Sequence, residues 1–138
     1  VLLFFIGLFV LIGGASNTGL ISDLSSSFPG FREGDSLSIT SLSIFTVVLS
    51  NIVSNVPAVM LITEMITDPT TMMLIALAAS STLAGNTTLI GSVANIIVAE
   101  RSENYGIRID FFKFMLVGIV VTVVTIAAMI LMINLMFN

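Results

Sequence analysis

Two short polar segments interrupt the apolar stretches of this chain, and their residue types could bind an ion or a small polar solute. The first is residues 50–57, Ser-Asn-Ile-Val-Ser-Asn-Val-Pro, and the second is residues 84–95, Ala-Gly-Asn-Thr-Thr-Leu-Ile-Gly-Ser-Val-Ala-Asn. Backbone groups at the depth of a bilayer cannot stay unpaired, so an irregular segment survives there only where it faces protein or a watery cavity. The two segments therefore indicate an ion or substrate site built from broken helices.

The chemistry of these segments would rest on helix ends rather than on charged side chains, because no Asp, Glu, Lys or Arg lies within the apolar stretches. A helix N-terminus offers free N–H groups and a partial positive charge to an anion. One such end would follow Asn55, with Pro57 in its first turn, and another would lie near Gly91. The opposite helix ends, near Ser50 and Ala84, would turn carbonyl oxygens toward the same region, and such oxygens suit a hard cation such as Na⁺.

Composition places the chain in a membrane. Of its 138 residues, 57% are hydrophobic and 9% are charged, whereas soluble domains carry roughly 25% charged residues. The net charge of −4 provides no basic surface for nucleic acid. Cysteine and histidine are absent, which excludes disulfides, cysteine zinc sites and Ser-His-Asp or Cys-His catalysis within this chain. The sequence predicts a membrane protein that is not an enzyme and that needs no cofactor beyond a coupling Na⁺.

The hydropathy pattern predicts an all-α membrane protein, with residues 1–138 forming a single transmembrane domain. Residues 1–22 carry no charge and are long enough to cross roughly 30 Å of hydrocarbon as a helix. Residues 23–38 form a polar loop, and a charged connector at 100–113 precedes an uninterrupted span at 114–136. Because the chain begins inside an apolar run, without an initiator Met or a basic leader, we expect a fragment from the C-terminal part of a larger protein.

The apolar stretch at 39–63 has two interpretations. It could cross the bilayer once, or it could enter, turn at residues 54–57 and leave by the same face. Each arm of such a hairpin would hold about 12 residues, or roughly 18 Å of helix, and would reach mid-membrane. A plain crossing places all four basic residues on one side, whereas Pro57 behind Asn55 fits the first turn of a new helix. The residues alone leave both alternatives open.

Both polar segments resemble those of the ion transporter superfamily, which contains divalent-anion/sodium symporters, arsenical pumps and NhaD-type sodium/proton antiporters. Residues 54–61, Ser-Asn-Val-Pro-Ala-Val-Met-Leu, and residues 84–95 carry the resemblance in the expected order and spacing. Members of this superfamily have two inverted repeats, each with a re-entrant hairpin followed by a helix broken at mid-membrane. The resemblance implies that this chain is the second repeat, with a hairpin at 39–66 and a broken helix at 71–100.

The resemblance also implies a secondary active transporter of a small anion, such as a carboxylate, arsenite or a similar oxyanion, coupled to Na⁺ or H⁺ by alternating access. It implies the prokaryotic inner (plasma) membrane, with the hairpin opening outward. Three of the four basic residues then place the 100–113 connector in the cytoplasm and the C-terminus outside. The hairpin tip is Ser54-Asn55-Val56 where carboxylate symporters usually have Ser-Asn-Thr. This difference disfavours a carboxylate substrate and favours the arsenical-pump and general anion-permease branch.

These interpretations name the expected partners and site residues. The partners are the anion, the lipid bilayer and the other inverted repeat, with a homodimer as a further candidate and no nucleic acid. The candidate substrate contacts are Ser54, Asn55, Thr87, Thr88 and Asn95. The candidate ligands of a coupling cation are Asn51, Asn55, Asn86 and Gly91, and no other metal site is predicted.

Three alternatives to an anion transporter remain open on the sequence. The first is a sodium/proton antiporter of the same superfamily, and the second is an ion channel built from the same re-entrant elements. The third is a structural membrane subunit whose polar side chains only join helices by hydrogen bonds.

Overall fold

The computed structural model describes residues 2–21, 23, 38–66 and 68–137, so most of the predicted polar loop lies outside it. The described residues form helices and no strands, which agrees with the expected all-α class. In chain order the helices are α1 (Leu2–Asn17), α3 (Ile39–Val53), α4 (Asn55–Met65), α5 (Thr71–Ala84), α6 (Val93–Glu103) and α7 (Phe111–Phe137). Among them, α7 alone is long and apolar enough to cross a membrane, whereas α3 and α5 are apolar but shorter.

Polar side chains cap the start of α3, α5, α6 and α7. Ser38 Oγ accepts a hydrogen bond from the N–H of Ser41 at 3.1 Å, at the start of α3. Asp110 Oδ1 accepts one from the N–H of Lys113 at 2.9 Å, at the start of α7. Each oxygen satisfies one of the N–H groups that the first turn of a helix leaves unpaired. The polar residues that bound the apolar stretches therefore set the helix boundaries.

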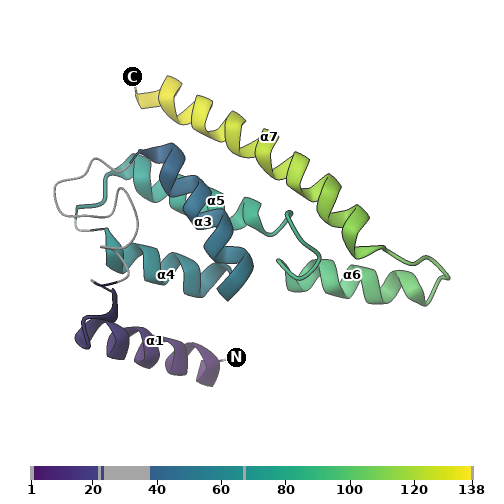
Figure 1. Cartoon of the computed structure of the whole chain (residues 1–138), viewed down its shortest axis with the longest axis horizontal. Coiled ribbons are helices and arrows are strands. Elements are labelled where there is room, and N and C mark those ends of the chain that lie inside the picture. The colour runs from purple at the N-terminus through teal and green to yellow at the C-terminus, as the bar shows by residue number, and fades with distance from the viewer. Residues whose placement is uncertain (1, 22, 24–37, 67, 138) are drawn as a thin grey trace.

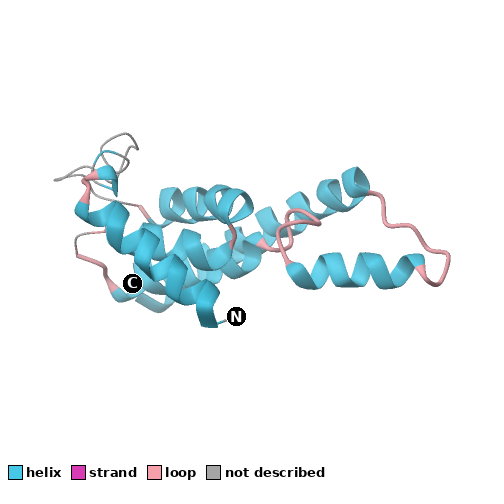
Figure 2. Ribbon diagram, turned by 90° about the horizontal axis from the view of Figure 1, so that it is seen from below, coloured by secondary structure: helices cyan, strands magenta, loops and turns pink. Residues whose placement is uncertain are grey.

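Helices α3 and α4 form a V-shaped hairpin that packs against α5 (Figure 1). Helix α6 continues beyond the end of α5, and α7 returns along α5 toward the hairpin (Figure 1). Figure 2 shows the connection between α5 and α6 as a loop in the middle of the molecule, with α6 extending to one side. Buried apolar side chains from four helices meet in one core: Leu42, Ile62, Ala76, Leu77 and Ile133.

A second, smaller cluster joins α1 to the hairpin through Ile12, Ile21 and Met65. Outside these clusters much of the apolar surface is exposed, and on α7 the side chains of Leu116 and Val120 and several of their neighbours are more than half exposed. Exposed apolar surface of this extent is unusual on a soluble monomer and is expected of a helix in contact with lipid or with other transmembrane helices.

Candidate functional site

A single strained residue separates α3 from α4. Ser54 has φ 78° and ψ 158°, and it is the one residue other than glycine with a positive φ in the described part of the chain. This backbone region is occupied essentially by glycine, and holding another residue there costs about 1–3 kcal/mol. The Ser54 side chain is exposed and makes no capping hydrogen bond to α4. A strained serine with a free hydroxyl at the point where two helices end is a candidate ligand contact.

Asn55, the first residue of α4, holds a buried oxygen that has no hydrogen-bond partner. Its Oδ1 and the Oγ of Ser50 are the two buried side-chain polar atoms left unpaired among the described residues. Leaving such an atom unpaired costs about 1–3 kcal/mol, so a bound ion, substrate or water is the usual explanation. Asn55 also lines a cavity of about 380 Å³, which Ser81 and Thr82 of α5 border on the other side.

The second break lies between Ala84, the last residue of α5, and Val93, the first residue of α6. The last carbonyls of a helix have no partner within the helix, and here a side chain from α6 supplies one. The Nδ2 group of Asn95 donates to the carbonyl of Gly85 at 2.8 Å and to that of Thr88 at 3.3 Å. Asn95 therefore ties the start of α6 to the end of α5 across the break.

The two breaks meet through Asn51, in the last turn of α3. Its Nδ2 donates to the carbonyl of Ala84 at 3.1 Å, and its Oδ1 accepts from the hydroxyl of Thr88 at 3.0 Å. The Thr88 hydroxyl in turn accepts from the N–H of Gly91 at 2.9 Å. A Cβ atom at residue 91 would lie 2.9 Å from Asn51 Oδ1, so glycine is needed for this close approach. The end of the hairpin arm and the α5–α6 break are thus one hydrogen-bonded unit.

Two residues of α7 that the sequence does not mark as candidates also contact this break. The hydroxyls of Thr122 and Thr87 lie 3.1 Å apart. Gly118, one turn earlier on α7, is buried, and a Cβ there would lie 2.7 Å from the carbonyl oxygen of Thr87. A glycine and a threonine four residues apart give a helix a small, polar face for close packing in a membrane. Within this apolar span, the four-residue spacing of Gly118 and Thr122 is the sequence feature that indicates a packing face.

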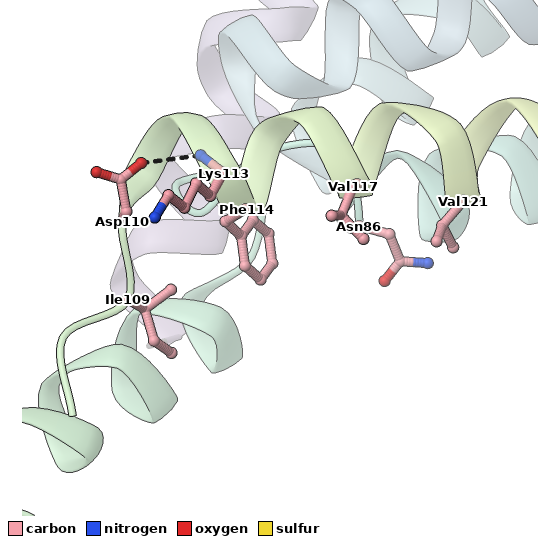
Figure 3. Close-up of a pocket in the computed structure, with 8 residues that line it drawn as sticks. Asn86, Ile109, Asp110, Lys113, Phe114, Val117 and Val121 are labelled. Carbon is pink, nitrogen blue, oxygen red and sulfur yellow. Dashed lines mark hydrogen bonds between the residues drawn. The ribbon is translucent and has the colours of Figure 1, made fainter.

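Asn86 belongs to the same break, but its side chain is exposed and is not part of the hydrogen-bonded unit. It lines a second cavity, of about 510 Å³, together with the first turns of α7, including Asp110 and Lys113 (Figure 3). In Figure 3 the Asn86 amide lies beside Val117 and Val121, away from the charged end of the cavity. Apart from Asn86, Asp110 and Lys113, the residues that line this cavity are apolar.

The structure therefore separates the predicted site residues into three groups. Asn51, Thr88, Gly91 and Asn95 belong to the hydrogen-bonded unit, with Thr87 beside it. Ser54 and Asn55 lie at the hairpin tip, and Asn86 lines the larger cavity.

The chemistry open to this arrangement follows from its donors and acceptors. No group of three or more acidic, His or Cys side chains that could hold a metal ion occurs in the part of the chain that the structure describes. Amide N–H and hydroxyl groups can donate hydrogen bonds to an oxyanion, and amide, hydroxyl and backbone carbonyl oxygens can coordinate Na⁺. Acid–base catalysis would instead need a group that titrates near neutral pH.

A chain of helices with two breaks joined by polar contacts, under a largely apolar surface, is typical of membrane transporters with discontinuous helices. Residues 1–72, slightly more than half of the chain, match the model of the family described as citrate transporter. The chain belongs to this family of integral membrane transporters, within the ion transporter superfamily that its two polar segments resemble.

Three relatives illustrate the range of proteins that the chain is similar to. It is 38% identical over 134 residues to the putative transporter arsB of Dictyostelium discoideum, covering 91% of this chain and 23% of that protein. It is 32% identical over 138 residues to the silicon efflux transporter LSI3 of Oryza sativa subsp. japonica, covering 91% and 28%. It is 30% identical over 136 residues to a 46 kDa membrane protein of Mycobacterium leprae, covering 91% and 32%.

The chain thus spans a third or less of the length of these relatives. No solved structure matches it.

Proposed function

We propose that this chain is the second inverted repeat of a secondary active transporter, which moves a small anion coupled to Na⁺ or H⁺ by alternating access. The observation that carries the proposal is the contact between the two breaks, through Asn51, Ala84 and Thr88. This contact brings two helix ends and several neutral polar groups together between stretches of the chain that are otherwise apolar. Such a meeting point at mid-membrane is where transporters of this kind bind substrate and ion.

In this proposal α3 and α4 are the arms of a re-entrant hairpin. With 15 and 11 residues, they are about 22 Å and 16 Å long, which is too short to cross roughly 30 Å of hydrocarbon. Helices α5 and α6 are the two halves of the broken transmembrane helix, and α7 is the last span. The 100–113 connector lies in the cytoplasm and the C-terminus outside, because three of the four basic residues are in that connector.

For the coupling cation, Asn55 is the strongest of the candidate ligands. Its Oδ1 is buried and unpaired, as is the Oγ of Ser50 near the end of α3, and Na⁺ accepts neutral oxygen ligands of this kind. Asn51 Oδ1 already accepts a hydrogen bond from Thr88, and Gly91 leaves room for that oxygen, so in this proposal these two residues shape the site. Asn86 is free to contact an ion from its own cavity.

For the substrate, we propose that the hydroxyls of Ser54 and Thr87 and the amide of Asn55 donate hydrogen bonds to the oxygen atoms of the anion. Thr88 and Asn95 already use their hydrogens on protein oxygens, so in this proposal they shape the substrate site. The N-terminus of α4, which begins at Asn55, would add backbone N–H groups and a partial positive charge. The names of the relatives support a small oxygen-rich solute, since the family is described as citrate transporter and one relative as a silicon efflux transporter.

Transport by the complete transporter in proteoliposomes tests this function. Citrate, succinate, sulfate, phosphate, arsenite and silicate would each be offered under an imposed Na⁺ gradient and, separately, under a pH gradient. Saturable uptake of one solute that follows either gradient supports the proposal. Single-channel currents instead of saturable uptake would identify a channel, and exchange of Na⁺ for H⁺ without any of these solutes would identify an antiporter.

A further inference from the structure

Helix α7 supports the α5–α6 break at two points, and we propose that Gly118 and Thr122 are positioning residues that hold the Asn86–Thr87 turn in its substrate-binding geometry. This inference rests on the proposed function, because the turn matters for transport only if Thr87 contacts the transported solute. Neither residue has a place among the candidate ligands, and both lie in the last apolar span. Their contacts to the turn are direct.

Thr122 acts on the side chain of Thr87. It is 3% exposed, and its hydroxyl lies 3.1 Å from that of Thr87 and 3.5 Å from the carbonyl of Leu83, the next-to-last residue of α5. These contacts fix the Thr87 side chain against a helix that is itself anchored in the core through Ile133.

A hydroxyl carries one hydrogen and two acceptor lone pairs, so the direction of the Thr87–Thr122 bond decides what Thr87 offers to a ligand. When Thr122 donates to Thr87, the Thr87 hydrogen is free to bind an anion. When Thr122 donates to the Leu83 carbonyl instead, Thr87 donates to Thr122 and presents only lone pairs, which suit a cation. Either hydroxyl can be the donor at this distance. Depending on which way Thr122 donates, the Thr87 hydroxyl can therefore bind either the anion or the cation of a coupled pair.

Gly118 acts on the backbone of the same turn. A Cβ atom at this position would clash with the carbonyl oxygen of Asn86 and would lie 2.7 Å from that of Thr87. Both contacts are to backbone atoms, which cannot rotate away as the end of a flexible side chain can. The glycine therefore permits α7 to touch the turn, and any larger residue must push the turn out of place.

Thr122→Val is the first test, since valine keeps the shape of threonine and removes the hydroxyl. In the complete transporter we expect the KM for whichever solute of the panel is transported to rise about 3- to 10-fold, the effect of one lost hydrogen bond, with the maximal rate within about twofold. Thr122→Ser should restore the KM. The matched control is Thr125→Val, because the Thr125 hydroxyl bonds only to carbonyls of its own helix. Equal KM values for Thr122→Val and wild type would overturn the role of this hydroxyl.

Gly118→Ala should have a larger effect, at least about 10-fold on Vmax/KM, because a displaced turn loses more than one hydrogen bond. Gly14→Ala is the control, since a Cβ at Gly14 would meet nothing within 4 Å.

A second readout does not need transport. Asn86→Cys, in a transporter without other reactive cysteines, would be labelled with a membrane-impermeant maleimide, and the rate would be compared with and without Thr122→Val or Gly118→Ala. We expect either substitution to change the labelling rate at least about threefold, whereas Thr125→Val and Gly14→Ala leave it unchanged. Equal labelling in all variants, fast or absent, would overturn the positioning role. Altered labelling in a protein that moves none of the solutes would keep that role and reject the proposed function.

Discussion

Replacing Asn51 by alanine removes the side chain that joins the two breaks, and the structure allows the cost to be worked out. The Asn51 amide makes two hydrogen bonds to the α5–α6 break, one to the Ala84 carbonyl at 3.1 Å and one from the Thr88 hydroxyl at 3.0 Å. A third bond, to the Val47 carbonyl, stays within α3. Each hydrogen bond between helices in a membrane protein contributes about 0.6–2 kcal/mol. Losing both bonds, Asn51→Ala should therefore lower the free energy of unfolding by about 1–4 kcal/mol.

Steric trapping, which monitors reversible unfolding of the complete transporter in lipid bicelles, measures this change in the free energy of unfolding. Asn104→Ala is the matched control, because Asn104 is exposed and follows the last residue of α6, far along the chain from the break. A double-mutant cycle with Thr88→Val isolates one bond, and we expect a coupling energy of about 0.6–1.7 kcal/mol. A cost for Asn51→Ala no larger than that for Asn104→Ala, together with zero coupling to Thr88, would refute the claim that this amide joins the breaks.

Three further substitutions test other parts of the site. Ser54→Gly should raise stability by about 1 kcal/mol by relieving the positive φ of 78°, and Ser54→Ala should not, so equal thermal stability of the two variants in detergent would argue against strain at this residue. Gly91→Ala should reduce transport at least about 10-fold, because its Cβ would lie 2.9 Å from Asn51 Oδ1 and would displace that oxygen from its hydrogen bond with Thr88; uptake equal to that of the Gly14→Ala control would contradict this close approach. Asn55→Ala should abolish coupled uptake while membrane insertion and the size-exclusion profile stay normal, since the variant loses an unpaired oxygen and no internal hydrogen bond; normal uptake would remove Asn55 from the site.

Much of the helical organisation follows from residues that can be recognised in the sequence. The polar residues that bound the apolar stretches predict helix ends, and Ser38 and Asp110 do cap α3 and α7. Glycine, serine and proline within the two polar segments predict interruptions, and the structure has non-helical residues at Ser54 and between α5 and α6. These features are local, so short-range chemistry is enough to predict them.

The partners of the polar side chains could not be predicted in the same way. The sequence predicts Asn51 and Asn95 as ligands, and only the way the helices pack shows that both donate to backbone carbonyls at the break. The sequence does not identify Gly118 and Thr122, because an apolar span gives few indications of which of its faces packs against another helix. The strain at Ser54 also depends on the angle between α3 and α4, which no single residue encodes.

The central claim is that the two breaks form the binding site of a gradient-driven transporter, and uptake in proteoliposomes tests it most directly. The complete transporter would be assayed with the panel of citrate, succinate, sulfate, phosphate, arsenite and silicate, each with and without a Na⁺ or pH gradient. We predict saturable uptake of one solute that follows a gradient and is lost in Asn55→Ala but retained in Asn104→Ala. Uptake that ignores both gradients, or that survives unchanged in Asn55→Ala, would contradict the claim.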